Sequence, residues 1–283
     1  MDNKTTHLKR LVNIRHLVLD MDGTIYNGRR LFNFTTDFFK KLDNLGIRYT
    51  YLTNNSSRNV SQYLEKIRSM NLKGTKENIY TSSLATIDYL QSRRPELQKL
   101  YILGTEGLKR EFREYGFTVV ETDGAMEPDG VVVGFDTSLD FKRLCKAGYW
   151  IKSGKPFIAT HPDRICPTDQ PTLLIDCGAI CAALSSATSR APDVVPGKPD
   201  PGMIWGIMER NKLHKEEVAM VGDRLYTDIE MARRAGVMGI LVLSGEATAE
   251  DVNNAVHQPD LIVENIRELG ELLEQSHQVN NRE

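Results

Sequence analysis

The stretch DMDGT, residues 20–24, directly follows the apolar run LVL and places Asp20 and Asp22 on either side of a single residue. The apolar run predicts a buried strand from His16 to Leu19, and the two acids stand where this strand ends. Ligands of open α/β sheets bind beyond the carboxyl ends of the strands, so this is a favourable place for a site. An ordinary turn built on Asp and Gly would also explain the pattern.

Further strands and helices alternate with this first strand, which predicts α/β architecture with a mostly parallel sheet. A helix near Thr35 to Leu45 ends at Gly46, and IRYTYL (47–52) follows as the second strand. Three more strands and a final amphipathic helix come late in the chain: VAMV (218–221), GILVL (239–243), LIV (261–263) and NIRELGELLEQ (265–275). We therefore predict a Rossmann-like, doubly wound parallel sheet as the core.

The middle of the chain has its own alternation and predicts an inserted α/β domain. Residues 99–121 read as strand, helix and strand, and residues 130–163 repeat that order. Strands of the first kind resume only after VVPGKPDPG. The predicted division is a core domain over 1–81, an inserted cap domain over 82–188 and the rest of the core over 189–283.

The composition is that of an ordinary globular protein. Of the 283 residues 40% are hydrophobic and 26% charged, and the formal net charge of −2 suggests no nucleic-acid partner. The first residues, MDNKTTHLKRLVNIRH, lack the apolar segment of a signal peptide, and no run is long enough for a membrane span, so a cytoplasmic protein is expected. The four cysteines form no CxxC pair, and Cys177 and Cys181 are predicted to be small buried residues.

A second motif, LTNNSSR (52–58), stands at the end of the second strand. Thr53, Asn54 and Asn55 offer a hydroxyl and backbone N–H groups at a strand-to-helix corner, where anions bind well. The alternative is that Ser56 or Ser57 only caps the following helix.

Lys198 lies between two prolines in PGKPDPGM (196–203), where Asp200 is placed to cap a helix that begins near Pro201. A lysine held in this way is a candidate anion ligand, although a solvated surface lysine is the commoner case.

The fourth motif is VAMVGDRLYTDIEMARRAG (218–236), a predicted strand, a turn and a helix. Asp223 follows the strand, and Asp228 near the start of the helix suits the helix dipole. A carboxylate at a further parallel strand end, beside Asp20 and Asp22, indicates a hard cation with oxygen ligands such as Mg²⁺.

In this order, DMDGT, LTNN, GKP and GDRLYTD resemble the motif set of haloacid dehalogenase superfamily phosphatases. The inserted domain, ATHPDR (159–164) and VGDRLYTDI (221–229) resemble the NagD-type 4-nitrophenylphosphatase branch, where Asn often stands in place of His161. The interval from Thr53 to Lys198 is the one long enough to hold a domain, which the resemblance implies to be a cap of type C2.

The resemblance implies a reaction and its residues. Asp20 would attack a phosphomonoester to form an aspartyl-phosphate, and Asp22 would protonate the leaving oxygen and later deprotonate water. Mg²⁺ would be held by Asp20, the backbone carbonyl of Asp22, and Asp223. The phosphoryl oxygens would be bound by Thr53, Asn54, Asn55 and Lys198, while Asp228 would orient a metal-bound water or Lys198.

The loop ATHPDRICP (159–167), with His161, Asp163 and Arg164, is the candidate for selecting the substrate, and His161 is counted among the substrate ligands. An ordinary turn at Pro162 and Asp163 is the alternative. The partner expected is a small phosphomonoester of unspecified identity, and similar proteins often pair through their caps. The alternative functions are a phosphotransferase or phosphomutase on the same scaffold, and a non-catalytic phosphate-binding protein.

Overall fold

The computed structural model describes residues 9–168 and 170–280, which fall into two compact units. Among the described residues, the first unit comprises residues 9–52, 70–73 and 204–280, and the second comprises residues 53–69, 74–168 and 170–203. The core and cap boundaries predicted at residues 82 and 188 stay a prediction.

The first unit is built on parallel strands in the hydrogen-bonded order β14-β13-β12-β1-β4. Strands β1, β12 and β13 are buried along their whole length, as expected of strands that are covered on both faces. Their register sets Leu19 of β1 opposite Val221 of β12. The strands are β1 (His16–Asp20), β4 (Arg48–Thr53), β12 (Val218–Gly222), β13 (Met238–Val242) and β14 (Leu261–Val263).

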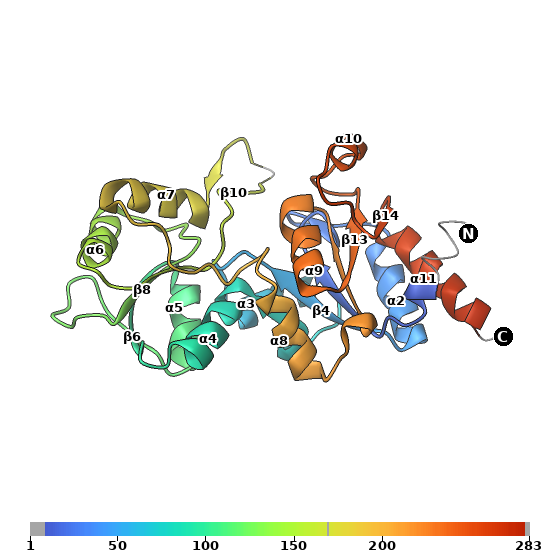
Figure 1. The fold of residues 1–283 in the computed structure, drawn as a ribbon, viewed down its shortest axis with the longest axis horizontal. Coiled ribbons are helices and arrows are strands. Elements are labelled where there is room, and N and C mark those ends of the chain that lie inside the picture. Colours follow the sequence, from blue (N-terminus) through green and yellow to red (C-terminus); the bar gives the residue numbers. More distant parts are fainter. Residues whose placement is uncertain (1–8, 169, 281–283) are drawn as a thin grey trace. The chain divides into compact units, whose positions relative to one another are not determined.

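Helices cover both faces of these strands, with α2 and α11 on one side and α9 on the other (Figure 1). Helix α2 buries Phe38, Phe39 and Leu42, and it ends at Gly46, whose φ of 67° suits glycine. The helices are α2 (Thr35–Leu45), α9 (Glu230–Ala235), α10 (Ala249–Asn253) and α11 (Ile266–Asn280); the short elements are β2 (Tyr26–Asn27), β3 (Arg30–Leu31), η2 (Lys215–Glu217) and η3 (Leu225–Ile229).

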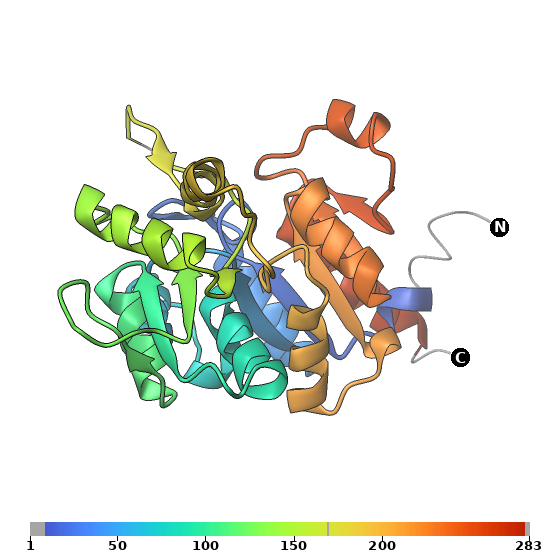
Figure 2. The same ribbon diagram turned by 60° about the vertical axis from the view of Figure 1, so that its left-hand side comes forward.

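The second unit holds a separate parallel sheet in the order β7-β6-β8-β9. Figure 2 shows α6 and α7 on one face of it and α4 and α5 on the other. The buried residues Cys177 and Cys181 of α7 pack with β6, β8 and β9, which confirms their predicted burial. The strands are β6 (Lys99–Leu103), β7 (Thr118–Val119), β8 (Gly130–Val133) and β9 (Phe157–Ala159), and the helices are α4 (Ser82–Arg93), α5 (Glu106–Glu114), α6 (Phe141–Lys152) and α7 (Cys177–Thr188).

A short antiparallel ribbon pairs β10 with β11 after the loop that carries His161 and Asp163. The remaining elements are α3 (Val60–Ser69), η1 (Lys76–Asn78), β5 (Ile79–Thr81), β10 (Ile165–Cys166), β11 (Leu174–Ile175) and α8 (Gly202–Asn211).

The predicted fold class is confirmed by these parallel sheets with helices on both faces. The two predicted strand-helix-strand repeats are also present, as β6-α5-β7 and β8-α6-β9. Across residues 9–168 and 170–280, every helix is too short or too polar to cross a membrane.

Inside the second unit, Glu111 of α5 is an unusual buried acid. It is 1% exposed, and its Oε1 accepts a hydrogen bond of 2.8 Å from the backbone N–H of Val60, at the start of α3. Burial raises the pKa of Glu111 to about 7, against the opposing effect of this bond. The folded state therefore keeps this proton up to about pH 7, well above the pH at which a glutamate of the unfolded chain ionises.

This raised pKa predicts that Glu111 makes the protein less stable as the pH rises. The folded state binds the proton of Glu111 more tightly than the unfolded chain does. The contribution of this proton to the free energy of unfolding is complete below the unfolded pKa and is lost as the pH rises through about 7. Glu111→Gln should remove this loss, so the free energy of unfolding of the variant relative to wild type should rise by on the order of 2 kcal/mol from pH 5 to pH 8.

Urea unfolding at both pH values measures the effect. Glu65→Gln, on the exposed surface of α3, is the matched control and should show no such rise. An equal difference between Glu111→Gln and wild type at pH 5 and pH 8 would contradict the prediction.

Candidate active site

Asp20 is the last residue of β1, and it is 8% exposed. The strand register sets it opposite Leu52 of β4, the residue before Thr53. Because β1 and β12 are parallel neighbours, the residues that follow them meet at the same edge of the sheet. This placement explains how Asp20 and Asp223 come together although they are far apart in the sequence.

Asp22 and Gly23 form the turn that the sequence predicts. Gly23 has a φ of 87°, and its N–H donates a hydrogen bond of 2.7 Å to the carbonyl of Tyr26. The half-buried Asp22 accepts a hydrogen bond of 3.3 Å at Oδ1 from the N–H of Gly28. A Cβ at Gly23 would lie 2.2 Å from Oδ2 of Asp223, so the turn needs glycine both for its backbone angle and for this close approach.

Three buried carboxylates meet beyond the ends of β1 and β12. Asp20, Asp223 and Asp228 each offer an oxygen within 4.8 Å of the others, and Asp223 and Asp228 are 3% and 0% exposed. Buried like charges at this separation oppose one another unless a cation or protons compensate them. The donor set, all oxygens, fits a hard divalent cation.

Asp228 belongs to this cluster by geometry, although the sequence suggests a place for it farther from the cation. The predicted helix over this region begins with a π-helical turn, η3, which precedes α9, and Asp228 lies inside that turn. Its Oδ2 also accepts a hydrogen bond of 3.1 Å from the N–H of Arg224. A Cβ at Gly222 would lie 2.3 Å from Cγ of Asp228, so the strand end must be glycine to admit this carboxylate.

Arg224 supplies a positive charge beside the acids. Its Nε lies 2.8 Å from Oε2 of Glu246, whose Oε1 accepts a hydrogen bond of 2.7 Å from the hydroxyl of Tyr226. Burial lowers the pKa of Arg224, but the nearby Tyr226, Glu246 and Asp20 outweigh burial and raise that pKa above its usual value. The guanidinium therefore stays charged next to the carboxylate cluster.

A loop after β13 holds Asp223, and its role was not predicted from the sequence. The N–H of Glu246 donates a hydrogen bond of 2.8 Å to Oδ2 of Asp223, and the N–H of Ala247 donates one of 3.1 Å to the backbone carbonyl of Asp223. The hydroxyl of Ser244 bonds the carbonyl of Gly23 at 2.8 Å. The available signal was the run SGEA directly after the strand GILVL, in the position where the other strands carry site residues.

In the second unit, Thr53 and the asparagines after it form a compact turn. The hydroxyl of Thr53 accepts a hydrogen bond of 3.2 Å from the N–H of Asn55, and Oδ1 of Asn55 accepts one of 2.9 Å from the N–H of Ser57. The helix α3 is capped by Asn59, whose Oδ1 accepts a hydrogen bond of 2.9 Å from the N–H of Gln62. The alternative that Ser56 or Ser57 is the cap is therefore wrong.

Lys198 is 4% exposed, so it is not a solvated surface lysine. Its backbone N–H donates a hydrogen bond of 2.8 Å to Oδ1 of Asn54, and its carbonyl accepts one of 3.1 Å from Nδ2 of Asn54. Asp200 accepts a hydrogen bond of 2.8 Å from the N–H of Gly202, in the capping place expected for it before α8. The structure thus holds the backbone of the lysine between a side-chain amide and a helix start.

His161 is 0% exposed, and both ring nitrogens have partners. Nδ1 lies 2.9 Å from Oγ1 of Thr160, and Nε2 lies 2.9 Å from Oδ1 of Asp176. Burial lowers the pKa of His161, but Cys177 and Asp176 outweigh burial and raise that pKa to about 9. This environment favours a supporting role for the ring, and the predicted substrate contact through His161 stays a prediction.

The other two residues of this loop differ from His161. Asp163 is half-buried, and its carboxylate accepts hydrogen bonds of 3.3 and 3.1 Å from Nδ2 of Asn54. Arg164 is exposed. The role of this loop in selecting the substrate stays a prediction.

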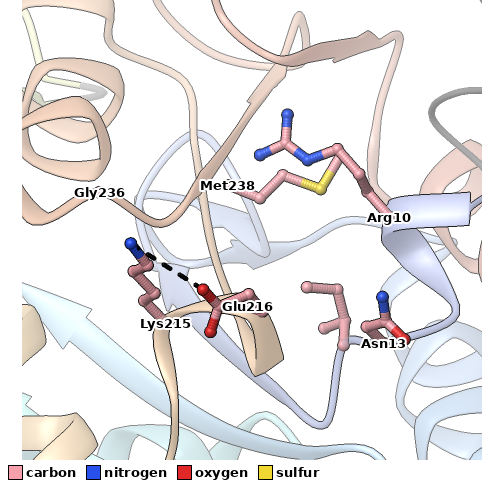
Figure 3. Close-up of a pocket in the computed structure, with 7 residues that line it drawn as sticks. Arg10, Asn13, Lys215, Glu216, Gly236 and Met238 are labelled. Atoms are coloured by element: carbon pink, nitrogen blue, oxygen red, sulfur yellow. Dashed lines mark ion pairs between the residues drawn. The ribbon is translucent and has the colours of Figure 1, made fainter.

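A small hollow in the first unit lies at the opposite ends of the strands (Figure 3). It sits near Lys215 and Glu216, which precede β12, and near Met238, which begins β13. An ion pair of 3.9 Å joins Lys215 and Glu216 within its lining. This hollow does not contain the acidic cluster, so it is separate from the candidate active site.

Comparisons with known proteins decide the family. A model described as haloacid dehalogenase-like hydrolase matches residues 17–118, and a second, HAD-hydrolase-like model matches residues 195–269. An acid sugar phosphatase of Staphylococcus aureus is 36% identical to the chain, over 84% of this chain and 89% of that protein. The chain belongs to the haloacid dehalogenase-like hydrolases.

Solved structures of this family agree with the assignment. A 4-nitrophenylphosphatase from Thermotoga maritima superposes with a TM-score of 0.87 and 38% identity, over 93% of this chain and 98% of that one. NagD from E. coli K-12 superposes with a TM-score of 0.80 and 29% identity, over 90% and 98%. The predicted membership in the phosphatases of this superfamily, in the NagD and 4-nitrophenylphosphatase branch, is confirmed.

The close approach of Gly245 to Asp223 predicts an effect on metal binding. A Cβ at Gly245 would lie 2.0 Å from Oδ2 of Asp223, so Gly245→Ala must displace this carboxylate from the acidic cluster. We expect the dissociation constant for a divalent cation to rise by about tenfold or more, measured by calorimetric titration with MgCl₂ as the probe.

The matched control is Gly148→Ala in α6, where the added Cβ would meet Leu184 at an ordinary 3.7 Å. This control should leave the dissociation constant unchanged. Circular dichroism checks that both variants are folded. Unaltered cation binding in a folded Gly245→Ala protein would disprove the positioning of Asp223 by this loop.

Proposed function

We propose that the protein is a Mg²⁺-dependent phosphatase that hydrolyses small phosphomonoesters through an aspartyl-phosphate intermediate. The observation that carries this proposal is the buried cluster of Asp20, Asp223 and Asp228 at the strand ends of a haloacid dehalogenase-like hydrolase. Relatives named acid sugar phosphatase and 4-nitrophenylphosphatase support the reaction class.

In the first step, an oxygen of Asp20 attacks phosphorus in line, and the bond from phosphorus to the leaving oxygen breaks. Asp22 gives its proton to that oxygen and then takes a proton from the water that hydrolyses the aspartyl-phosphate. Asp20, Asp223 and the backbone carbonyl of Asp22 would hold Mg²⁺, which would supply the positive charge that an anionic substrate needs to approach an anionic nucleophile. The carboxylate of Asp228 supports this charge balance, directly or through a bound water.

The phosphoryl oxygens are assigned to the residues that follow β4 and to Lys198. Thr53 offers its hydroxyl, Asn54 and Asn55 lie in the same anion-binding turn, and Lys198 contributes positive charge. Because the side chains of Asn54 and Asn55 already have protein partners, the proposed contribution of Asn54 is its backbone N–H. Such preorganised donors stabilise charge that develops in the transition state.

The substrate class is a small, polar phosphomonoester. Sugar phosphates are the first group to test, because a relative is named for them. A phosphotransferase or phosphomutase and a non-catalytic phosphate-binding protein are the alternatives to exclude. Pairing of two copies through the predicted cap domain stays a prediction.

The role of Asp20 predicts that Asp20→Asn lowers phosphate release from 4-nitrophenyl phosphate in Mg²⁺ by at least about 10³-fold. Removing the metal with a chelator should have a similar effect on the wild type. Asp37→Asn, on the exposed surface of α2, is the matched control and should keep wild-type activity. Full activity in Asp20→Asn would place the nucleophile elsewhere.

The role of Asp22 as an acid predicts a dependence on the leaving group. 4-Nitrophenolate leaves without needing a proton, whereas the alcohol oxygen of a sugar phosphate needs one. Asp22→Asn should therefore slow leaving-group release from glucose 6-phosphate by at least about tenfold more than from 4-nitrophenyl phosphate. Rapid-mixing measurements of the first turnover isolate this step, and equal slowing of both substrates would argue against the acid role.

A further inference from the structure

The side chain of Asn54 joins two loops that the proposed reaction uses separately. Its Oδ1 accepts from the N–H of Lys198 at 2.8 Å, and its Nδ2 donates to the carbonyl of Lys198 at 3.1 Å. The same Nδ2 donates to both carboxylate oxygens of Asp163, at 3.3 and 3.1 Å. Asn54 is 5% exposed, so these bonds form out of contact with bulk water.

The backbone around these bonds is closely packed. A Cβ at Gly197, next to Lys198, would lie 2.5 Å from the carbonyl oxygen of Thr160 and 2.9 Å from Oδ1 of Asn54. On the other side of the loop, a Cβ at Gly178 of α7 would lie 2.0 Å from the carbonyl oxygen of Pro162. The segment from Thr160 to Asp163 therefore contacts the backbone at two glycines, Gly197 and Gly178, where a side chain would not fit.

Buried polar contacts hold the base of this segment. His161 is fixed between Thr160 and Asp176, and Oγ1 of Thr160 also bonds Oγ of Ser56 at 3.0 Å. Oγ of Ser56 accepts a further hydrogen bond of 2.9 Å from the N–H of Phe135. Because each of these groups is buried and bonded, the loop presents Asp163 to Asn54 in one geometry.

We propose that the Asn54 side chain is a positioning residue that couples the loop of residues 160–164 to the backbone of Lys198. A shift of the loop is transmitted to the lysine through one amide. The position of the loop and the position of the lysine that binds the phosphoryl group are therefore coupled. This inference rests on the proposed function, in which Lys198 binds the phosphoryl group. It gives Asp163 a defined task, which is to hold the Asn54 amide.

Exchanging the donor and the acceptor tests the coupling. Asn54→Asp places a carboxylate against Asp163 and removes the donor to the carbonyl of Lys198, so kcat/KM for 4-nitrophenyl phosphate should fall by about 30-fold or more. Asp163→Asn keeps one acceptor oxygen and should stay within about threefold of wild type. In the double variant the amide introduced at position 163 can donate to the carboxylate introduced at position 54, so kcat/KM should recover by about fivefold or more over Asn54→Asp.

Asn59→Asp is the matched control, because Asn59 is also a buried asparagine after β4 but bonds Gln62 at the start of α3 and not Lys198. It keeps the capping oxygen and should leave kcat and KM unchanged. A structural role alone would lower the free energy of unfolding in Asn54→Asp without rescue of kcat/KM by Asp163→Asn. The proposed coupling predicts that Asp163→Asn rescues kcat/KM of Asn54→Asp. It also predicts that the ratio of kcat/KM for 4-nitrophenyl phosphate to that for glucose 6-phosphate differs between Asn54→Asp and wild type.

Binding of inorganic phosphate, measured by calorimetric titration in the same four-protein cycle, separates this inference from the proposed function. If wild type hydrolyses phosphomonoesters but the effects of Asn54→Asp and Asp163→Asn simply add in both assays, the coupling is overturned and the function stands. If wild type hydrolyses none of them but phosphate binding is non-additive in the cycle, the proposed function fails and the coupling stands.

Discussion

Mutual repulsion among three buried carboxylates is the constraint on which the candidate site depends. Asp20, Asp223 and Asp228 have little or no exposed surface, and their nearest oxygens lie within 4.8 Å. In water such charges would separate, but here each is carried by a strand end or a turn that the sheet holds in place. The arrangement is costly for the protein alone, and a bound divalent cation would offset this cost by neutralising the charge.

The backbone around the cluster is shaped so that the acids can approach. Gly23, Gly222 and Gly245 each leave the space that a Cβ would take from Asp223 or Asp228. The loop after β13 adds a hydrogen bond to Oδ2 of Asp223, which fixes the direction in which this carboxylate points. The geometry of the acidic cluster therefore depends on the glycines, which lack a Cβ, and on backbone N–H groups as well as on the acids themselves.

The second unit uses a different principle, which is the satisfaction of buried polar groups. Asn54 uses both its carbonyl and its amide, and His161 uses both ring nitrogens. Groups that are buried and fully bonded have few alternative conformations, so they are well suited to hold a loop and poorly suited to contact a substrate directly. This distinction assigns a supporting role to the side chains of Asn54 and His161, although residues of these types look like ligands in the sequence.

The sequence by itself determined the parallel α/β fold, the order of the four motifs and the placing of Asp20, Asp22, Thr53 and Asp223 at or just after strand ends. Periodicity, turn residues and buried apolar runs act over a few neighbouring residues, so they can be read without the fold. Only the tertiary structure decided that Asp228 joins the acidic cluster, that residues 244–247 hold Asp223, that His161 is buried, and that Asn54 bonds Lys198 and Asp163. These features depend on contacts between residues distant in the chain. Apart from the run SGEA at a strand end, such contacts leave no local pattern in the sequence.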